Sequence, residues 1–210
     1  MRLRLIRWIR DNVIKILAPC FKQITIRELV TGLARIPRCA GQTTTALPYS
    51  VAQHSVLVAR LTEYHGGDAA DIRLAALLHD AHEFVTGDIT RPVQQAIAHI
   101  LPAEVADPIK HLQAMAQAAI LDRFAPGLNS HSARIAAVVS AADDCALVTE
   151  RRDLRAAPSH PECHRPTIAA APHQIQIWPW AKAAEEFIKA YAAAAHLLGT
   201  DPDIGLTQTI

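Results

Sequence analysis

Residues 77–89 read LLHDAHEFVTGDI, and this stretch is the most informative part of the sequence. The apolar residues leading into it recur at helical spacing, which predicts one helix over about 70–85 with a glycine after its end. His79 and Asp80 stand in the most hydrophobic part of that helix, and Glu83 lies one turn further on. A buried ionisable group without a partner is costly, so these side chains must be satisfied together. A divalent cation does this, because it binds carboxylate oxygens and imidazole nitrogens directly.

Two further predicted helices carry a polar residue on an apolar face. His54 shares the apolar face of a helix predicted near 50–64, although a lone histidine in such a position is more often a hydrogen-bonded core residue. Asp143 interrupts a run of small residues in a long helix predicted near 131–155. Small neighbours favour a close approach between helices, which is where a shared metal ion can sit.

Together these positions offer two imidazole nitrogens and two carboxylates from three helices: His54, His79, Asp80 and Asp143. Mixed nitrogen and oxygen ligation suits one Mn, Fe, Co, Ni, Zn or Mg ion better than a closed structural zinc site. Fewer than six protein ligands leave positions for water and a substrate oxygen, which is the layout of metal-assisted hydrolysis. Glu83 and Asp88 are then two further acids. One can position or deprotonate the attacking water, and the other can protonate the leaving oxygen.

The rest of the chain predicts an all-α fold. Half of the residues are hydrophobic but only 5% are aromatic, and no segment shows convincing period-two alternation. Helices are predicted near 3–17, 26–34, 50–64, 70–85, 90–101, 104–123, 131–155 and 180–198. We divide the chain into an N-terminal amphipathic helical extension over 1–25, one domain over 26–200 with a proline-rich loop or lid at 157–179, and a C-terminal tail over 201–210.

Charge, cysteines and hydropathy limit the setting. Lys and Arg number 21 against 20 Asp and Glu, and the net charge of +1 argues against a nucleic-acid partner held by a basic face. The four cysteines form no CxxC pair, and we expect neither a signal peptide nor a membrane span, hence a cytoplasmic protein with reduced thiols. We interpret the N-terminal segment as a docked or dimer-forming surface helix rather than a membrane-surface helix.

Two other polar groups have plain interpretations. His160, Cys163 and His164 lack a complementary pair for zinc, which normally takes four ligands, so we assign them to a loop. Residues 150–153, Glu-Arg-Arg-Asp, are predicted to form a solvated face with ion pairs that contribute little to stability.

The pattern as a whole resembles the HD-domain metal-dependent phosphohydrolases. Three segments carry the resemblance: YSVAQHS at residues 49–55, LLHDAHEFVTGDI at 77–89 and AAD at 141–143. The dipeptide His-Asp alone is a weak signal, but the longer match is specific and covers about residues 26–155. The spacing is most similar to the bacterial 5′-deoxynucleotidase branch and to related phage deoxynucleoside triphosphate hydrolases.

The resemblance implies a helical bundle around a single divalent metal site. It also implies hydrolysis of the phosphate ester of a small-molecule nucleotide, with a deoxynucleoside 5′-monophosphate as the first candidate. The residues that match the family's metal ligands are His54, His79, Asp80 and Asp143, and those that match its acidic pair are Glu83 and Asp88. A homodimer follows from the resemblance by analogy alone. The alternatives are a deoxynucleoside triphosphate triphosphohydrolase and a non-catalytic nucleotide-binding HD module, and the intact acidic pair argues against the second.

Family members also hold the phosphate with an arginine that precedes the first histidine. Arg38 is our candidate for that role and Arg35 is its rival, since a guanidinium fork suits phosphate oxygens. His82 is an additional imidazole three residues after His79. It could join the metal ion or hold a second one, but we expect it to contact a metal ligand or to lie in solvent. Many relatives carry a basic residue in the stretch after Pro92, where this sequence has two glutamines.

Overall fold

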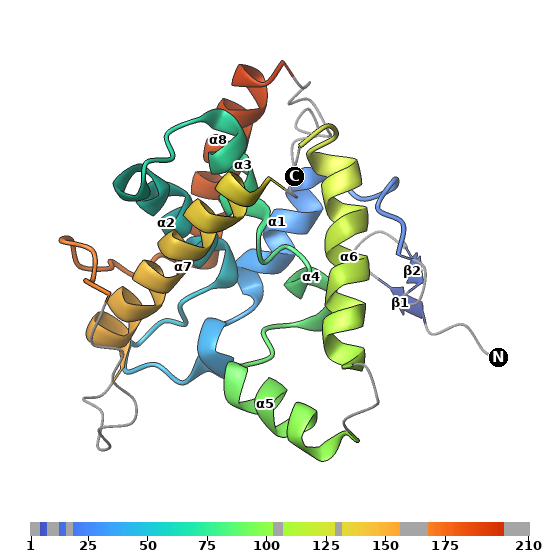
Figure 1. The fold of residues 1–210 in the computed structure, drawn as a ribbon, viewed down its shortest axis with the longest axis horizontal. Coiled ribbons are helices and arrows are strands. Elements are labelled where there is room, and N and C mark those ends of the chain that lie inside the picture. Colours follow the sequence, from blue (N-terminus) through green and yellow to red (C-terminus); the bar gives the residue numbers. More distant parts are fainter. Residues whose placement is uncertain are drawn as a thin grey trace.

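The computed structural model describes residues 5–7, 13–15, 19–102, 107–128, 132–155 and 168–199. The described part is a helical bundle, which confirms the all-α prediction (Figure 1). Its longer helices are α1 (Ile26–Arg35), α2 (Val51–Leu61), α3 (Ala70–Leu78), α5 (Arg91–Ile100), α6 (Pro108–Phe124), α7 (Ala133–Leu154) and α8 (Trp180–Leu197). Three single-turn elements join them: η1 (Arg38–Gly41), η2 (Thr62–His65) and α4 (Glu83–Thr86).

Helix α2 lies at the centre of the bundle. It packs against α1, α3, α7 and α8, and all but two of its residues are buried. A helix that is buried on nearly every side belongs to the core and not to the surface of the bundle. Its first turn is capped by Ser50, whose side chain accepts a hydrogen bond from the backbone of Gln53. The polar side chains that α2 carries into the core must therefore find partners on the helices around it.

Helix α1 supports the site from one side. It begins with a capping box, in which Thr25 and Glu28 exchange backbone and side-chain hydrogen bonds. Gly32 lies against the ring of Phe84, and a Cβ atom at this glycine would come within 2.4 Å of that ring. This close approach holds α4 against α1.

The helix predicted over 70–85 is broken in the structure. Helix α3 ends at Leu78, residues 79–82 form a turn, and α4 starts at Glu83. The prediction of one continuous helix is wrong, because apolar spacing continues across the turn while its hydrogen bonds change. Gln117 on α6 holds the turn from outside: its side chain donates to the Leu78 carbonyl at 2.6 Å and accepts from the His82 backbone amide at 3.1 Å.

The predicted helix near 3–17 is also wrong where the structure describes this segment. Two short strands, β1 (Leu5–Arg7) and β2 (Val13–Lys15), pair antiparallel with Ile6 opposite Ile14. Val and Ile are β-branched and favour strands, which outweighs the helical spacing here. The predicted C-terminal tail and the cluster of His160, Cys163 and His164 lie outside the described residues.

The described part of the proline-rich loop, residues 168–179, is anchored to the bundle. Arg152 donates to the carbonyls of Ala171 and His173, and Gln53 bonds the backbone of residues 176 and 178. Side chains from α7 and α2 therefore hold this segment against the bundle. Within the described residues, no helix is both long and apolar enough to cross a bilayer.

Candidate metal and phosphate site

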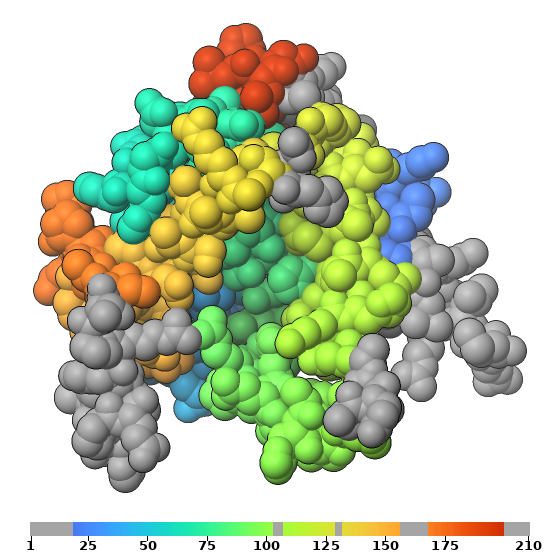
Figure 2. All heavy atoms as spheres, in the orientation of Figure 1, coloured from blue at the N-terminus to red at the C-terminus, as the bar shows by residue number. Residues whose placement is uncertain are grey.

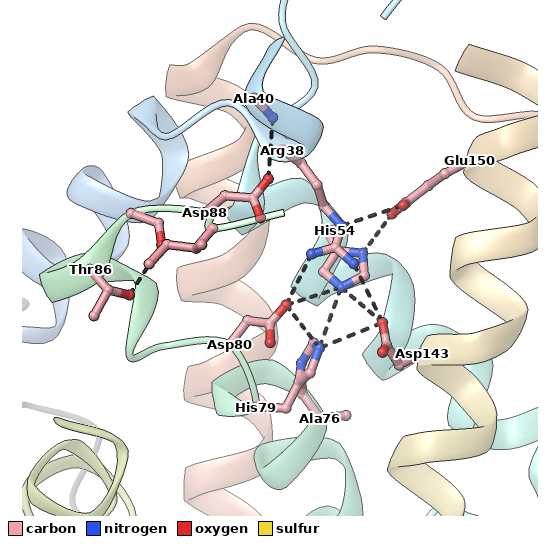
Figure 3. Close-up of polar contacts among 12 residues, drawn as sticks. Arg38, Ala40, His54, Ala76, His79, Asp80, Thr86, Asp88, Asp143 and Glu150 are labelled. Atoms are coloured by element: carbon pink, nitrogen blue, oxygen red, sulfur yellow. Dashed lines mark hydrogen bonds and ion pairs between the residues drawn. The ribbon is translucent and has the colours of Figure 1, made fainter. Parts of the chain in front are cut away.

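Four side chains that are far apart in the sequence face one another inside the bundle (Figure 3). His54 comes from α2, His79 and Asp80 from the turn after α3, and Asp143 from α7. His54 Nε2 lies 3.3 Å from His79 Nε2, 3.4 Å from Asp80 Oδ2 and 3.2 Å from Asp143 Oδ1. His79 Nε2 lies 3.3 Å from Asp80 Oδ2 and 3.9 Å from Asp143 Oδ1. The structure therefore brings together the four residues that the sequence singled out as metal ligands.

Hydrogen bonds on the far side of both imidazole rings determine which nitrogen faces this cluster. His54 Nδ1 lies 2.6 Å from Glu150 Oε1, and His79 Nδ1 lies 2.7 Å from the carbonyl oxygen of Ala76. A carboxylate and a carbonyl can only accept, so each Nδ1 is the donor, and in a neutral ring this leaves the lone pair on Nε2. Metal-binding histidines are typically oriented by partners of this kind.

The spacing of the facing atoms suits a bound cation. Metal–ligand bonds of about 2.1 Å place neighbouring ligand atoms about 3.0–3.4 Å apart. The separations around His54 Nε2 are 3.2–3.4 Å. Asp143 Oδ1 is buried and makes no hydrogen bond among the described residues, which leaves this oxygen available to a cation. The donor set of His54, His79 and Asp80 thus fits a divalent metal ion.

Both aspartates of the cluster are ionised at neutral pH. Burial by itself raises the pKa of Asp80, but His79, His54 and Arg38 together lower it well below its usual range. The pKa of Asp143 is likewise lowered to about 2, because its contacts with His54 outweigh the effect of burial. The two carboxylates are therefore available as anionic ligands.

Arg38 joins the cluster from η1, whereas Arg35 does not. Arg38 Nη1 lies 3.1 Å from Asp80 Oδ2, and Nη2 lies 3.6 Å from Asp143 Oδ1. Arg35 instead stacks over the ring of Trp180, at 4.3 Å from the ring centroid, on the surface between α1 and α8. Of the two arginines that the sequence offered as phosphate ligands, only Arg38 lies beside the candidate metal ligands.

The backbone that carries Arg38 adopts an unusual conformation. Cys39 and Ala40 have φ values of 58° and 53°, a left-handed region in which residues other than glycine are strained. The Arg38 amide donates to the carbonyl of Tyr49 at 2.8 Å, and the Ala40 amide donates to Asp88 Oδ2 at 3.4 Å. These bonds hold the strained turn and also place Asp88 beside η1.

Glu83 begins α4 and is buried. The residue is 6% exposed, and its Oε2 has no hydrogen-bond partner among the described residues. Burial, and then the negative charges of Asp80 and Asp88, raise its pKa to about 9. Glu83 therefore carries a proton at neutral pH in this arrangement. One of its oxygens also lies within 4.8 Å of ligand atoms of Asp80 and His82, whose imidazole is half-buried behind the turn.

Glu150 was missed by the sequence analysis as a site residue. It is 2% exposed, and its two oxygens contact His54 Nδ1 and Arg38 Nε, at 2.6 Å and 3.3 Å. The prediction of a solvated face is wrong for this residue, although Arg152 and Asp153 do form an ion pair with the arginine well exposed. The signal was its spacing: Glu150 follows Asp143 by seven residues, two helical turns, and so lies on the same face of α7.

The candidate site opens toward solvent beside a hollow. Figure 2 shows the surface hollowed between α6 and α7, with the α3–α4 segment at its floor. A cavity of about 350 Å³ lies among α3, α6 and α7, and its lining is mostly apolar and small, with Ala75, Ala114, Ala118 and Val139 beside His79. A ligand held at the cluster can extend an apolar group into this cavity.

Comparison with known proteins finds a likeness over the central part of the chain. Residues 51–148 match the family model for the HD domain. The match contains His54, His79, Asp80 and Asp143 and ends before Glu150. An uncharacterized protein of Rhodobacter capsulatus is 44% identical over 92 residues, which are 43% of this chain and 47% of that protein. The chain thus spans about half the length of this curated relative.

Proposed function

We propose that this protein is a metal-dependent phosphohydrolase that cleaves the phosphate ester of a nucleotide, with a deoxynucleoside 5′-monophosphate as the expected substrate. The observation that carries the proposal is the convergence of two Nε2 atoms and two carboxylates next to the guanidinium of Arg38. A cation held by the first group and an arginine beside it form a site for an anion with several oxygens. The HD domain over residues 51–148 supports this reaction class.

Each residue has a part in the proposed reaction. A bound divalent cation lowers the pKa of water and polarises a phosphoryl oxygen. His54, His79, Asp80 and Asp143 hold that ion. The Arg38 guanidinium offsets the charge that develops on the phosphoryl oxygens, a contribution that is large in a partly buried site.

Glu83 and Asp88 are the proposed acid–base pair. Glu83 is buried and retains its proton up to a pKa of about 9, which suits it to donate to the leaving oxygen. A cation at the cluster favours the ionised form of Glu83 and so also allows it to orient the attacking water. Asp88 lies beside η1, where it accepts a hydrogen bond from the Ala40 amide, and takes the complementary role.

The cavity between α3, α6 and α7 supports a substrate that carries a group of limited polarity beside its phosphate. Its volume of about 350 Å³ lies within the usual range of small-molecule pockets. It adjoins His79, so a phosphate bound at the cluster places the rest of the molecule near it. A nucleobase meets these requirements of size and polarity.

The test is phosphate release by protein that has been stripped of metal and resupplied with Mn, Co, Zn or Mg. The panel comprises ribo- and deoxynucleoside mono-, di- and triphosphates. We expect metal-dependent release from deoxynucleoside monophosphates, lost in Asp80→Ala together with metal content and retained in Asp68→Ala, an exposed aspartate on the approach to α3. Unchanged metal content in Asp80→Ala would contradict the ligand assignment.

Two results of the same panel redirect the proposal. Turnover of triphosphates without monophosphates would indicate a triphosphohydrolase. Metal and nucleotide binding without any product would indicate a non-catalytic module. Glu83→Ala separates chemistry from binding: it should retain metal while slowing turnover by about 10²–10⁴-fold, and normal turnover would remove Glu83 from the mechanism.

A further inference from the structure

We propose that Glu150 is a positioning residue that sets two parts of the site at once, the metal ligand His54 and the phosphate-binding Arg38. This inference rests on the proposed function for the role of Arg38, and on the metal site alone for the role of His54. It concerns a carboxylate that lies outside the segment matched by the HD-domain family model.

The two oxygens of Glu150 serve different partners. Oε1 lies 2.6 Å from His54 Nδ1, and Oε2 lies 3.3 Å from Arg38 Nε. The side chain is 3% exposed, so water does not compete for either oxygen. Dashed lines in Figure 3 mark both contacts, on the side of His54 away from the cluster.

The contact with His54 selects a tautomer. An acceptor at Nδ1 requires the proton there, and in the neutral ring that a metal ion binds, this leaves the Nε2 lone pair directed at Asp80 and Asp143. His54 is completely buried in α2, and within the described residues its Nδ1 has no hydrogen-bond partner besides Glu150. Removal of this acceptor therefore leaves the ring free to place its proton on Nε2, where it blocks metal binding.

The contact with Arg38 orients the guanidinium. With Nε held by Glu150, the two Nη atoms are turned toward Asp80 and Asp143, at 3.1 Å and 3.6 Å. Arginine is planar, so fixing one edge fixes the direction of the other. A single carboxylate thus links metal affinity to phosphate affinity.

A merely structural ion pair would behave differently from a positioning residue. Loss of a structural pair lowers stability and leaves the binding of metal and phosphate unchanged in the protein that remains folded. Loss of a positioning residue lowers both affinities in folded protein. Glu150→Gln separates the two cases, because glutamine keeps the shape but must present its NH₂ group to either the His54 donor or the Arg38 donor.

The experiment measures binding to folded protein by calorimetry. Zn²⁺ is titrated into metal-free wild type, Glu150→Gln, Glu150→Asp and Asp153→Asn, the last being a matched ion-paired acid on the same helix. Inorganic phosphate is then titrated into the zinc-loaded proteins. We expect Glu150→Gln to weaken zinc binding by about 10–100-fold where its NH₂ group faces His54, or to weaken phosphate binding where that group faces Arg38. Asp153→Asn should stay close to wild type, and Glu150→Asp should lie between the two.

Zinc and phosphate affinities of Glu150→Gln within twofold of wild type would overturn the inference. Zinc binding needs no turnover, so an inactive wild type that binds zinc refutes the proposed function and still tests the role of Glu150 on His54. If the variants do not fold, ¹⁵N-detected histidine spectra of the zinc-loaded wild type decide. The inference requires His54 to show a protonated, hydrogen-bonded Nδ1 and a metal-bound Nε2, and the opposite assignment overturns it.

Discussion

Replacing the buried acid Glu83 by glutamine should stabilise the metal-free protein, and the gain should grow with pH. Glu83 is 6% exposed, and the pKa of its carboxyl is raised to about 9 by burial and by the neighbouring aspartates. The unfolded chain releases this proton near its ordinary pKa of about 4.3. Between these two values the folded state holds a proton that the unfolded state does not.

The sign and size of the effect follow from linkage. Because the pKa of Glu83 is higher in the folded than in the unfolded state, binding of its proton stabilises the folded protein. This stabilisation is fully present below the unfolded pKa and is lost as the pH rises toward 9. Each pH unit in this window costs about 1.4 kcal/mol. At pH 7.5 the loss reaches about 2–4 kcal/mol after allowance for relaxation around the carboxyl, while at pH 5 it is below about 1 kcal/mol. Glutamine has no proton to lose and avoids the penalty at every pH.

The assay is urea unfolding of metal-free protein, in the presence of a chelator, at pH 5.0, 6.0, 7.0 and 8.0. Glu83→Gln should exceed wild type in unfolding free energy by an amount that increases with pH. Glu63→Gln is the matched control, because Glu63 is 57% exposed in its pair with Arg73 and should show no such trend. Parallel pH profiles for wild type and Glu83→Gln would refute the account of Glu83 as a buried, protonated acid.

Three further predictions test the scaffold and the anion site. Gly32→Ala should lower the unfolding free energy by about 1–3 kcal/mol through its clash with Phe84. In a thermal melt, adding Phe84→Leu to this variant should restore part of the loss, whereas additive losses from the two substitutions would show that the contact is absent. Gln117→Ala removes two hydrogen bonds from the turn after α3, so it should lower the unfolding free energy in urea by about 1–3 kcal/mol and weaken zinc binding in calorimetry. An unchanged urea midpoint would mean that α6 does not hold the turn. Arg38→Lys keeps the charge but loses the fork, and it should raise KM for a phosphate ester about tenfold with metal content unchanged, whereas an unaltered KM would exclude Arg38 from phosphate binding.

The helices and the metal-ligand set could be predicted from the sequence because both depend on local spacing. Helical periodicity placed His54 and Asp143 on inward faces, and hydrophobic surroundings marked His79 and Asp80 as buried. The structure confirms the all-α fold, and it brings these four side chains together. Their roles as metal ligands remain a proposal that the metal-content experiment tests.

The tertiary structure alone decided the features that depend on contacts distant in the sequence. The break after Leu78 is held by α6, and the apolar spacing that crosses it gives no sign of the turn. Arg38 and Arg35 have the same chemistry, and only the strained turn of η1 carries one of them to the cluster. Glu150 finds its partner 96 positions away in the sequence, and a charge run on a helix looks solvated until the helix that covers it is known. Local patterns therefore determined which residues are buried, while packing between helices determined what each of them contacts.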